Sequence, residues 1–315
     1  MSPRVAWLAT ATALVCAAAV PGCGFGAGAS SPGTATLTVT RDYGSKTMLQ
    51  ATDEDPPSSE TVIRFLDGEA DIATRYGGGF VQSINGLAGT GSSDWFFYVN
   101  GIESPVGSAD VQVKGGEKIW WDYRDWTAAM SVPAVVGSWP EPFAQNSVDH
   151  PQAVPVECLG VRPACETVSK RIDEAGAKAA PIMSEGKARS ADAPRVLVGT
   201  WPRVGADPAV DDLRGSPQGT GVFATFKGPI HGSWHLIGLD QTGQPGRDLG
   251  PGAGLVAALR GSGDQPTWIV TGSGASAVRR AADSLDSDSL RNRYAVAATG
   301  GGAVPLPIVQ EGGAQ

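Results

Sequence analysis

The sequence predicts an α+β protein, and three observations support this fold class. Its 43 glycines and 23 prolines favour short strands and many turns over long helices. Residues 36–126 show strand-like alternation around one helix signal, whereas residues 132–298 alternate between strand and helix patterns. The length of 315 residues agrees with about two domains of ordinary size.

The first predicted domain, residues 36–126, begins with a β-hairpin. Leu37–Thr40 alternates apolar and polar residues as a strand does, and Lys46–Gln50 is its expected partner. Ser58 can cap a helix that Gly68 ends. Further strands are predicted at Asp71–Tyr76, Phe80–Ile84, Trp95–Val99, Val111–Val113 and Ile119–Tyr123. This order indicates one helix packed on a curled sheet.

Three segments of this domain stand out for their order and spacing: Gly79–Gly86 (GFVQSING), Trp95–Gly101 (WFFYVNG) and Val113–Trp121 (VKGGEKIWW). Together they resemble the transcobalamin-like C-terminal domain family. The resemblance implies a β-grasp-type fold that is also found in bacterial surface proteins. In cobalamin carriers this domain covers one face of a corrinoid, so the resemblance implies a corrinoid as the first ligand to test. No bound cofactor is predicted.

The second predicted domain, residues 132–298, has an α/β pattern. Strands are expected at Val132–Trp139, Val154–Cys158, Arg195–Trp201, Gly221–Phe226, Trp234–Leu239, Thr267–Val270 and Tyr294–Ala297, and helices at Cys165–Ala175, Gly254–Arg260 and Ala275–Leu285. The near-identical pentads Val136–Pro140 and Val198–Pro202 predict two diverged αβ units, with chance similarity as the alternative. The arrangement resembles a domain that accompanies the first one in lipoproteins of the actinobacterial type. Residues 299–315 are expected to form a flexible tail.

The first 22 residues have the pattern of an export signal. Their apolar run, Val5–Val20, is too short to span a bilayer and is typical of a signal peptide. The residues that follow, ending at Cys23, resemble a bacterial lipobox, which implies a lipidated Cys23 at the outer face of the cytoplasmic membrane. Residues 23–35 would then be the lipidated cysteine and a flexible tether. The alternative is cleavage near Ala19, which leaves Cys23 free.

Charge and cysteine content restrict the partners. The formal net charge is −8 and no stripe of Lys and Arg is present, which argues against nucleic-acid binding. Cys158 and Cys165 remain as a pair, and in an exported chain they are expected to form a disulfide. Two cysteines are too few for a metal site, so no metal is predicted there.

An aromatic group on the predicted strands is the main candidate for ligand binding. Because side chains alternate on a strand, one set must be core and the other is free to bind a flat ring or a sugar. The residues selected are Trp95, Tyr98, Asn100 and Trp121. The alternative is that the second set packs against the C-terminal domain.

Three further motifs each have a structural explanation that the sequence favours. Gly250–Gly254 can hold a phosphate at a helix start, but tight turns explain it better. Asp53–Asp55 lacks the pattern of a calcium loop and is expected to be a solvated loop. His231 and His235 would share one side of a strand and can hold a metal only with a third ligand.

These observations predict a binding module rather than an enzyme. The sequence lacks the nucleophile elbow, the zinc-protease helix and the Walker loop. The expected protein is a membrane-anchored extracytoplasmic lipoprotein that binds a soluble ligand, with a corrinoid as one candidate, or another surface component. The alternative is a structural module of the cell envelope with no small-molecule ligand.

Overall fold

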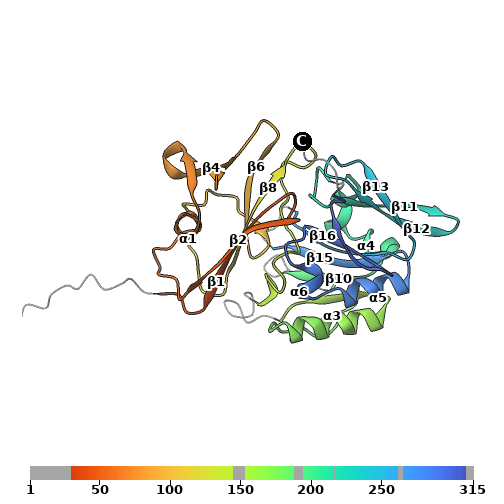
Figure 1. The fold of residues 1–315 in the computed structure, drawn as a ribbon. Helices are drawn as coiled ribbons and strands as arrows, with labels where there is room; N and C mark the ends of the chain where they lie inside the picture. The colour runs from red at the N-terminus through yellow and green to blue at the C-terminus, as the bar shows by residue number, and fades with distance from the viewer. Residues whose placement is uncertain (1–29, 145–152, 188–193, 216, 262–264, 310–315) are drawn as a thin grey trace, which may run out of the picture.

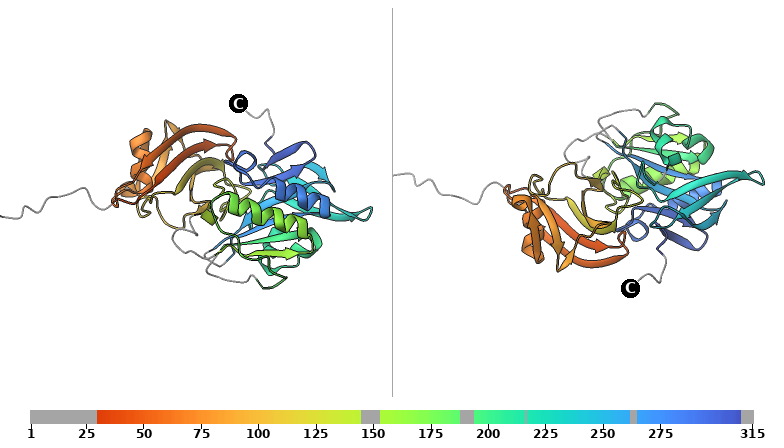
Figure 2. Two further views of the ribbon diagram at one scale, coloured as in Figure 1. Left: turned by 90° about the horizontal axis from the view of Figure 1, so that it is seen from below. Right: turned by 90° about the horizontal axis from the view of Figure 1, so that it is seen from above.

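The computed structural model describes residues 30–144, 153–187, 194–215, 217–261 and 265–309. Two parts lie side by side (Figures 1 and 2), which we call the N-terminal part, residues 30–126, and the C-terminal part, residues 153–309. A connecting segment, residues 127–144, joins them. The mixture of several sheets and few helices confirms the predicted α+β class. No helix of the described residues is long and apolar enough to cross a membrane.

The N-terminal part is built on a five-stranded sheet with the order β2-β1-β8-β6-β7. Its strands are β1 (Thr34–Arg41), β2 (Lys46–Glu54), β6 (Ser93–Val99), β7 (Ile102–Glu103) and β8 (Lys118–Asp125). The predicted hairpin of β1 and β2 is confirmed, and β8 runs parallel to β1. Leu37 and Val39 point into the core from β1, as the alternation predicts.

Helix α1 (Val62–Glu69) and a small sheet close one side of this five-stranded sheet. The buried residues of α1, Val62, Phe65 and Leu66, pack in one cluster with residues of β1 and β8. The small sheet has the order β3-β4-β5 and contains β3 (Ile72–Arg75), β4 (Phe80–Ile84) and β5 (Leu87–Ala88), with the 3-10 turn η1 (Tyr76–Gly78) between the first two. The helix starts after Thr61 instead of at the predicted cap Ser58, and it includes Gly68.

The C-terminal part contains a six-stranded sheet with the order β17-β16-β14-β15-β10-β9. Its strands are β9 (Val156–Leu159), β10 (Arg195–Thr200), β14 (Gly254–Leu259), β15 (Thr267–Gly272), β16 (Ala295–Thr299) and β17 (Gly302–Leu306). Strands β9, β10 and β15 are parallel, whereas β14, β16 and β17 pair antiparallel. The central strands are buried on both faces, which explains their continuous apolar runs.

Each face of the six-stranded sheet carries its own layer (Figures 1 and 2). Helices α3 (Arg162–Glu174) and α5 (Ala275–Asp283) pack on one face, and the short α6 (Ser287–Leu290) follows α5. The other face is covered by a three-stranded sheet, β11 (Ala224–Ile230), β12 (Ser233–Leu239) and β13 (Pro245–Gly250), together with α4 (Trp201–Val204) and η2 (Pro208–Gly215). Helix α5 approaches β14 so closely that a Cβ on Gly254 would lie 2.2 Å from the carbonyl oxygen of Ala277.

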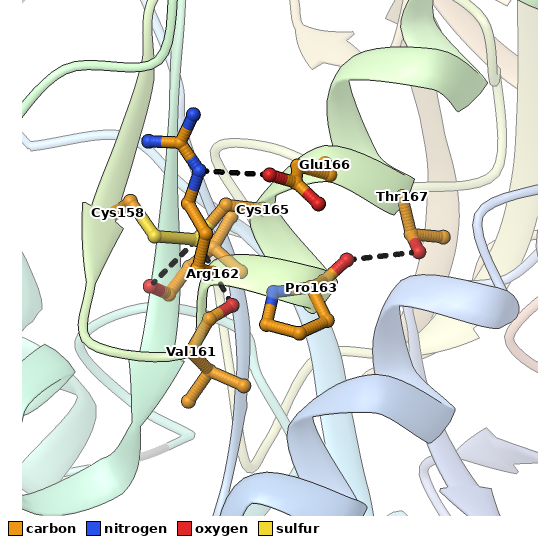
Figure 3. Close-up of a disulfide and its surroundings, with 8 residues drawn as sticks. Cys158, Val161, Arg162, Pro163, Cys165, Glu166 and Thr167 are labelled. Carbon is orange, nitrogen blue, oxygen red and sulfur yellow. Dashed lines mark hydrogen bonds and ion pairs between the residues drawn. A yellow bond between two sulfur atoms is a disulfide. The ribbon is translucent and has the colours of Figure 1, made fainter.

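The predicted disulfide between Cys158 and Cys165 is confirmed, with Cα atoms 5.7 Å apart. Figure 3 shows the bond beside the first turn of α3, where Arg162 pairs with Glu166 at 2.9 Å. The bond ties the end of β9 to α3, and the chain-entropy estimate for so short a loop is about 2–3 kcal/mol.

Two predictions about the C-terminal part are wrong. The segment Gly254–Arg260 forms strand β14 instead of a helix, because β15 and β16 pair with it on both edges. The two pentads do not mark two equivalent units, because Val198–Pro202 covers the end of β10 and the start of α4, whereas Val136–Pro140 lies in the connecting segment and forms no strand. Trp139 packs on the α3 and α5 side of this sheet, whereas Trp201 packs on the opposite side.

Three further segments also differ from the predictions. Within residues 132–139, which were expected to form a strand, only Ala134 makes a β-bridge, to Ile102. The expected flexible tail, residues 299–315, is ordered as far as it is described, because β17 pairs with β16 and Ile308 donates its N–H to Leu239. The predicted signal peptide and Cys23 lie outside the described residues.

Candidate ligand pocket in the N-terminal part

The paired strands β6 and β8 present aromatic side chains on both sides of the five-stranded sheet. Phe97 lies opposite Trp121, and Tyr98 lies opposite Trp120. Because side chains alternate, Phe97 and Trp121 share the side that packs with α1, which we call the α1-facing side. Tyr98 and Trp120 share the other side, which packs with the C-terminal part and which we call the C-facing side.

A mostly apolar pocket of about 240 Å³ borders the α1-facing side, and we call it the aromatic pocket. Its walls come from β4, β6, β8 and the loop after β7. The residues that line it are Gly79, Phe80, Val81, Trp95, Phe96, Phe97, Glu103, Ser104, Val106, Gly107, Ser108 and Trp121.

Three rings form the inner wall of the aromatic pocket. Trp95 and Trp121 are only 5% and 3% exposed, and Phe97 stacks on Trp121 with ring centroids 4.9 Å apart. The Nε1 of Trp95 donates to the carbonyl oxygen of Leu87 at 2.9 Å, which fixes that ring. The Nε1 of Trp121 has no hydrogen-bond partner within the described residues. The wall is therefore a packed aromatic surface that contains one unpaired N–H donor, on Trp121.

The rim of the aromatic pocket exposes apolar side chains to solvent. Phe80 is 38% exposed and Val106 is 50% exposed. Tyr76, which is 87% exposed, lies edge-on to Phe80 with ring centroids 6.3 Å apart. The hydroxyl of Ser104 donates to the carbonyl oxygen of Val106 at 2.9 Å, which holds the rim loop in a turn. Apolar side chains grouped on a surface in this way are characteristic of binding sites.

Glu103 is the charged residue of the pocket lining, and its carboxylate already has partners that do not line the pocket. It accepts the N–H of Val132 at 3.0 Å and the hydroxyl of Ser131, and Arg124 lies 3.7 Å away. Because this charge is held by other partners, the lining favours a neutral, apolar group over an ion.

The C-facing side has a different chemistry, because it holds a buried carboxylate. Asp122 accepts hydrogen bonds from the hydroxyls of Thr40 at 2.6 Å and Tyr294 at 2.8 Å, and from the N–H of Gly44 at 3.0 Å. Burial raises the pKa of Asp122 to about 6, against the opposing effect of these bonds. Burial also raises the pKa of Tyr294 well above its usual value.

Aromatic rings surround this carboxylate on the C-facing side. The ring of Tyr294 lies 5.1 Å from that of Tyr43, 5.4 Å from that of Trp120 and 5.9 Å from that of Tyr98. The Nε1 of Trp120 donates to the hydroxyl of Thr40 at 2.7 Å. These residues form one buried cluster with the C-terminal part. Around Asp122 the C-facing side is therefore a packed interface that leaves no room for a ligand.

The four residues selected from the sequence divide between these environments. Trp95 and Trp121 line the aromatic pocket, whereas Tyr98 is fully buried on the C-facing side. Asn100 lies in a turn with a φ of 54°, and its Oδ1 accepts the N–H of Lys118 at 2.9 Å. The expectation that the second aromatic set is free to bind is wrong for Tyr98, and the packed alternative is confirmed.

Sequence reasoning missed the rim residues. Phe80 belongs to the segment that carries the family resemblance, so its position after three glycines was a usable signal. Val106 lies in a loop without periodicity, and no sequence pattern distinguishes it from other loop valines. Phe97 was part of the aromatic group, and its pairing with Trp121 could be predicted only from the strand register.

The weaker sequence candidates have structural roles. The turn interpretation of Gly250–Gly254 is confirmed, since it joins β13 to β14. Asp55 accepts the N–H of Gly33 at 2.7 Å in a loop. His231 lies in the turn before β12, so it does not share a strand face with His235, whose Nδ1 lies 3.1 Å from Asp248. The described residues include no group of three or more His, Cys, Asp or Glu that could hold a metal ion.

Comparisons with known proteins agree with the resemblance found in the sequence. Residues 59–125 match the family described as "Domain of unknown function (DUF4430)", which is the transcobalamin-like family, and this region contains every residue that lines the aromatic pocket. No curated protein matches the chain. Among solved structures, a protein from Ruminococcus gnavus that is provisionally described as metal-binding is 12% identical, with a TM-score of 0.24. That match covers 30% of this chain and 97% of the Ruminococcus gnavus chain.

Proposed function

We propose that the protein is a membrane-anchored extracytoplasmic binding module whose aromatic pocket receives a flat apolar ring of a soluble ligand. The observation that carries this proposal is the combination of a packed aromatic wall with an exposed apolar rim at Phe80 and Val106. Large apolar side chains exposed beside a preformed apolar hollow are more typical of a binding site than of an inert surface. We propose binding without catalysis.

The size of the aromatic pocket limits what it can enclose. Pockets that bury a whole small ligand usually measure about 300–1,000 Å³. The aromatic pocket, at about 240 Å³, is below that range. It fits one ring or one edge of a larger molecule, whose remainder would lie across the rim. A corrinoid, which the transcobalamin-like resemblance suggests, is a large flat molecule of this kind and is the first probe to use.

The test is a fluorescence titration of residues 24–315, a chain that contains every described residue. Trp95 and Trp121 report directly on the pocket, and cobalamin analogues and cell-wall fragments are the probes, with correction for corrinoid absorbance. Replacing the tryptophans would damage the core, so the test variants are Phe80→Ser and Val106→Asp on the rim. We expect saturable quenching that weakens by about tenfold in each variant, as expected for a lost apolar contact or a buried unpaired charge.

Met130→Ser is the matched control for this titration. Met130 is 68% exposed but does not line the aromatic pocket, so its replacement removes an exposed apolar side chain elsewhere. The control should bind as the wild type does. Equal quenching in all four proteins would exclude the aromatic pocket as the binding site.

The anchoring part of the proposal depends on Cys23 and needs its own experiment. In a bacterial host, the mature wild-type protein should begin at a diacylated or triacylated Cys23, as measured by intact mass spectrometry. Cys23→Ala should release the folded protein from the membrane fraction. An unmodified N-terminus between Ala19 and Cys23 would instead support ordinary signal cleavage.

A structural role in the cell envelope is the second candidate. It is favoured by the C-facing side, where aromatic residues that could have bound a ligand pack against the C-terminal part instead. If no soluble probe quenches the fluorescence, capture of envelope components on immobilised protein becomes the deciding experiment, with Phe80→Ser again as the variant.

A further inference from the structure

A second cavity, also of about 240 Å³, lies where the N-terminal part meets the connecting segment and α6. We call it the polar cleft. It is separate from the aromatic pocket, since the two cavities share no lining residue. The lining residues that matter here are Thr36, Thr38, Lys118, Ser138, Arg291 and Asn292.

Strand alternation explains why one wall of this cleft is polar. Leu37 points into the core of the N-terminal part, so its neighbours Thr36 and Thr38 point to the C-facing side. Thr36 lies opposite Lys118 in the parallel pairing of β1 with β8. The Asn100 side chain accepts the backbone N–H of Lys118, so the predicted site residue Asn100 helps to position this lysine.

Lys118 connects the two walls and retains free protons. Its Nζ donates to the carbonyl oxygen of Trp139 at 2.7 Å. An ammonium group has three protons, so two remain for other acceptors. Burial lowers the pKa of Lys118; nearby Glu141 opposes this change and nearby Arg291 adds to it.

Arg291 brings a second positive charge to the same cleft. Its guanidinium is 62% exposed and lies 3.9 Å from the carboxylate of Asp288, which is fully exposed. Ion pairs of this exposed kind contribute little. The cleft thus holds two cationic groups, with Glu141 near Lys118, together with hydroxyl and amide donors on Ser138 and Asn292.

We propose that the polar cleft binds a small oxyanion, either a carboxylate or a phosphate group, between Lys118 and Arg291. An oxyanion there accepts charge-assisted hydrogen bonds from both cations. Ser138 and Asn292 supply neutral donors. Because Lys118 belongs to the N-terminal part and Arg291 follows α6, the bound anion would link the two parts of the molecule.

Isothermal titration calorimetry of residues 24–315 with inorganic phosphate, and separately with succinate, tests this proposal. Sodium chloride holds the ionic strength constant, so that only specific binding gives a saturable signal. We expect at least one anion to saturate the protein and to raise its Tm, since it binds the folded state. The stronger of the two probes identifies the oxyanion class.

The variants Arg291→Gln and Lys118→Gln should each weaken binding by about tenfold, which is the usual effect of losing one charged hydrogen bond. Arg279→Gln is the matched control, because Arg279 is an exposed arginine on α5 that does not line the cleft. It removes the same charge and should bind as the wild type does. Absence of saturable binding by both anions, or equal affinity in all three variants, would overturn the proposal.

Discussion

The two sides of the strand pair β6 and β8 carry similar numbers of aromatic rings but differ in how those rings are covered. On the α1-facing side the rings of Phe97 and Trp121 are covered incompletely, and a pocket remains. On the C-facing side Tyr98 and Trp120 are enclosed by a ring from the far end of the chain, Tyr294. Aromatic content alone therefore does not identify a binding face. Whether a face stays open depends on which other parts of the chain pack against it.

The largest expected effect is on the C-facing side, through Tyr294. Tyr294→Ala removes a fully buried ring that touches three aromatic neighbours and leaves Asp122 without one of its donors. We expect a loss of about 3–5 kcal/mol in the free energy of unfolding. Urea denaturation followed by fluorescence measures it. Tyr294→Phe keeps the ring and should lose roughly 1.5–3 kcal/mol, the contribution of a hydrogen bond to a charged group.

A smaller effect is expected on the α1-facing side. Phe97 is only partly buried beside the pocket, so Phe97→Ala creates less new cavity than a fully buried site would. We expect a loss of about 2 kcal/mol, below the usual range for buried phenylalanine. Ligand quenching of Trp121 should weaken at the same time. A loss as large as that of Tyr294→Ala would show that the two sides are equally well packed.

The buried carboxylate makes the C-facing side sensitive to pH. The folded-state pKa of Asp122, about 6, lies above the ordinary value of about 3.9, so protonated Asp122 favours the folded state. Its stabilising contribution is complete below pH of about 4 and is lost as pH rises through about 6, by roughly 3 kcal/mol. Unfolding measured across this interval should show the decline in the wild type and a flatter profile in Asp122→Asn. An equal slope in both proteins would exclude Asp122 as the titrating group.

The smallest expected effect is the difference in stability between variants of two adjacent tryptophans. The Nε1 of Trp120 donates to Thr40, whereas the Nε1 of Trp121 has no partner within the described residues. Both replacements by phenylalanine remove similar volume. We therefore expect Trp120→Phe to cost about 1 kcal/mol more than Trp121→Phe, the typical net contribution of a hydrogen bond. Thermal unfolding of the two variants side by side measures this difference.

Much of the local structure could be predicted because its signals are local. The hairpin of β1 and β2 and helices α3 and α5 follow directly from periodicity and turn residues. The disulfide follows from two cysteines seven residues apart. Strand β14 could not be predicted, because Leu255–Leu259 is a short apolar run rich in helix-forming residues. Pairing on both edges made it a strand, and that information lies outside the segment.

The candidate pocket was half predictable for a similar reason. Side-chain alternation along β8 places Trp121 and Trp120 on opposite sides of the sheet, and the sequence alone predicts this. Which side stays open depends on Tyr294 and on the loop that contains Val106. No local sequence pattern predicts where either of them packs. The polar cleft needed even more distant information, since Lys118 and Arg291 are brought together only by the assembled fold.

The hydrogen bond from Tyr294 to Asp122 joins residues 172 positions apart in the chain. A ribosome that adds about 5–20 residues per second needs roughly 10–35 s to make the stretch between them. During that interval the nascent N-terminal part presents an uncovered surface with aromatic rings, and Asp122 lacks the hydrogen bond from the Tyr294 hydroxyl. We expect a chaperone that holds unfolded chains to bind this surface until Tyr294 is made. A chain truncated before Tyr294 would never cover the surface and would remain dependent on such a chaperone.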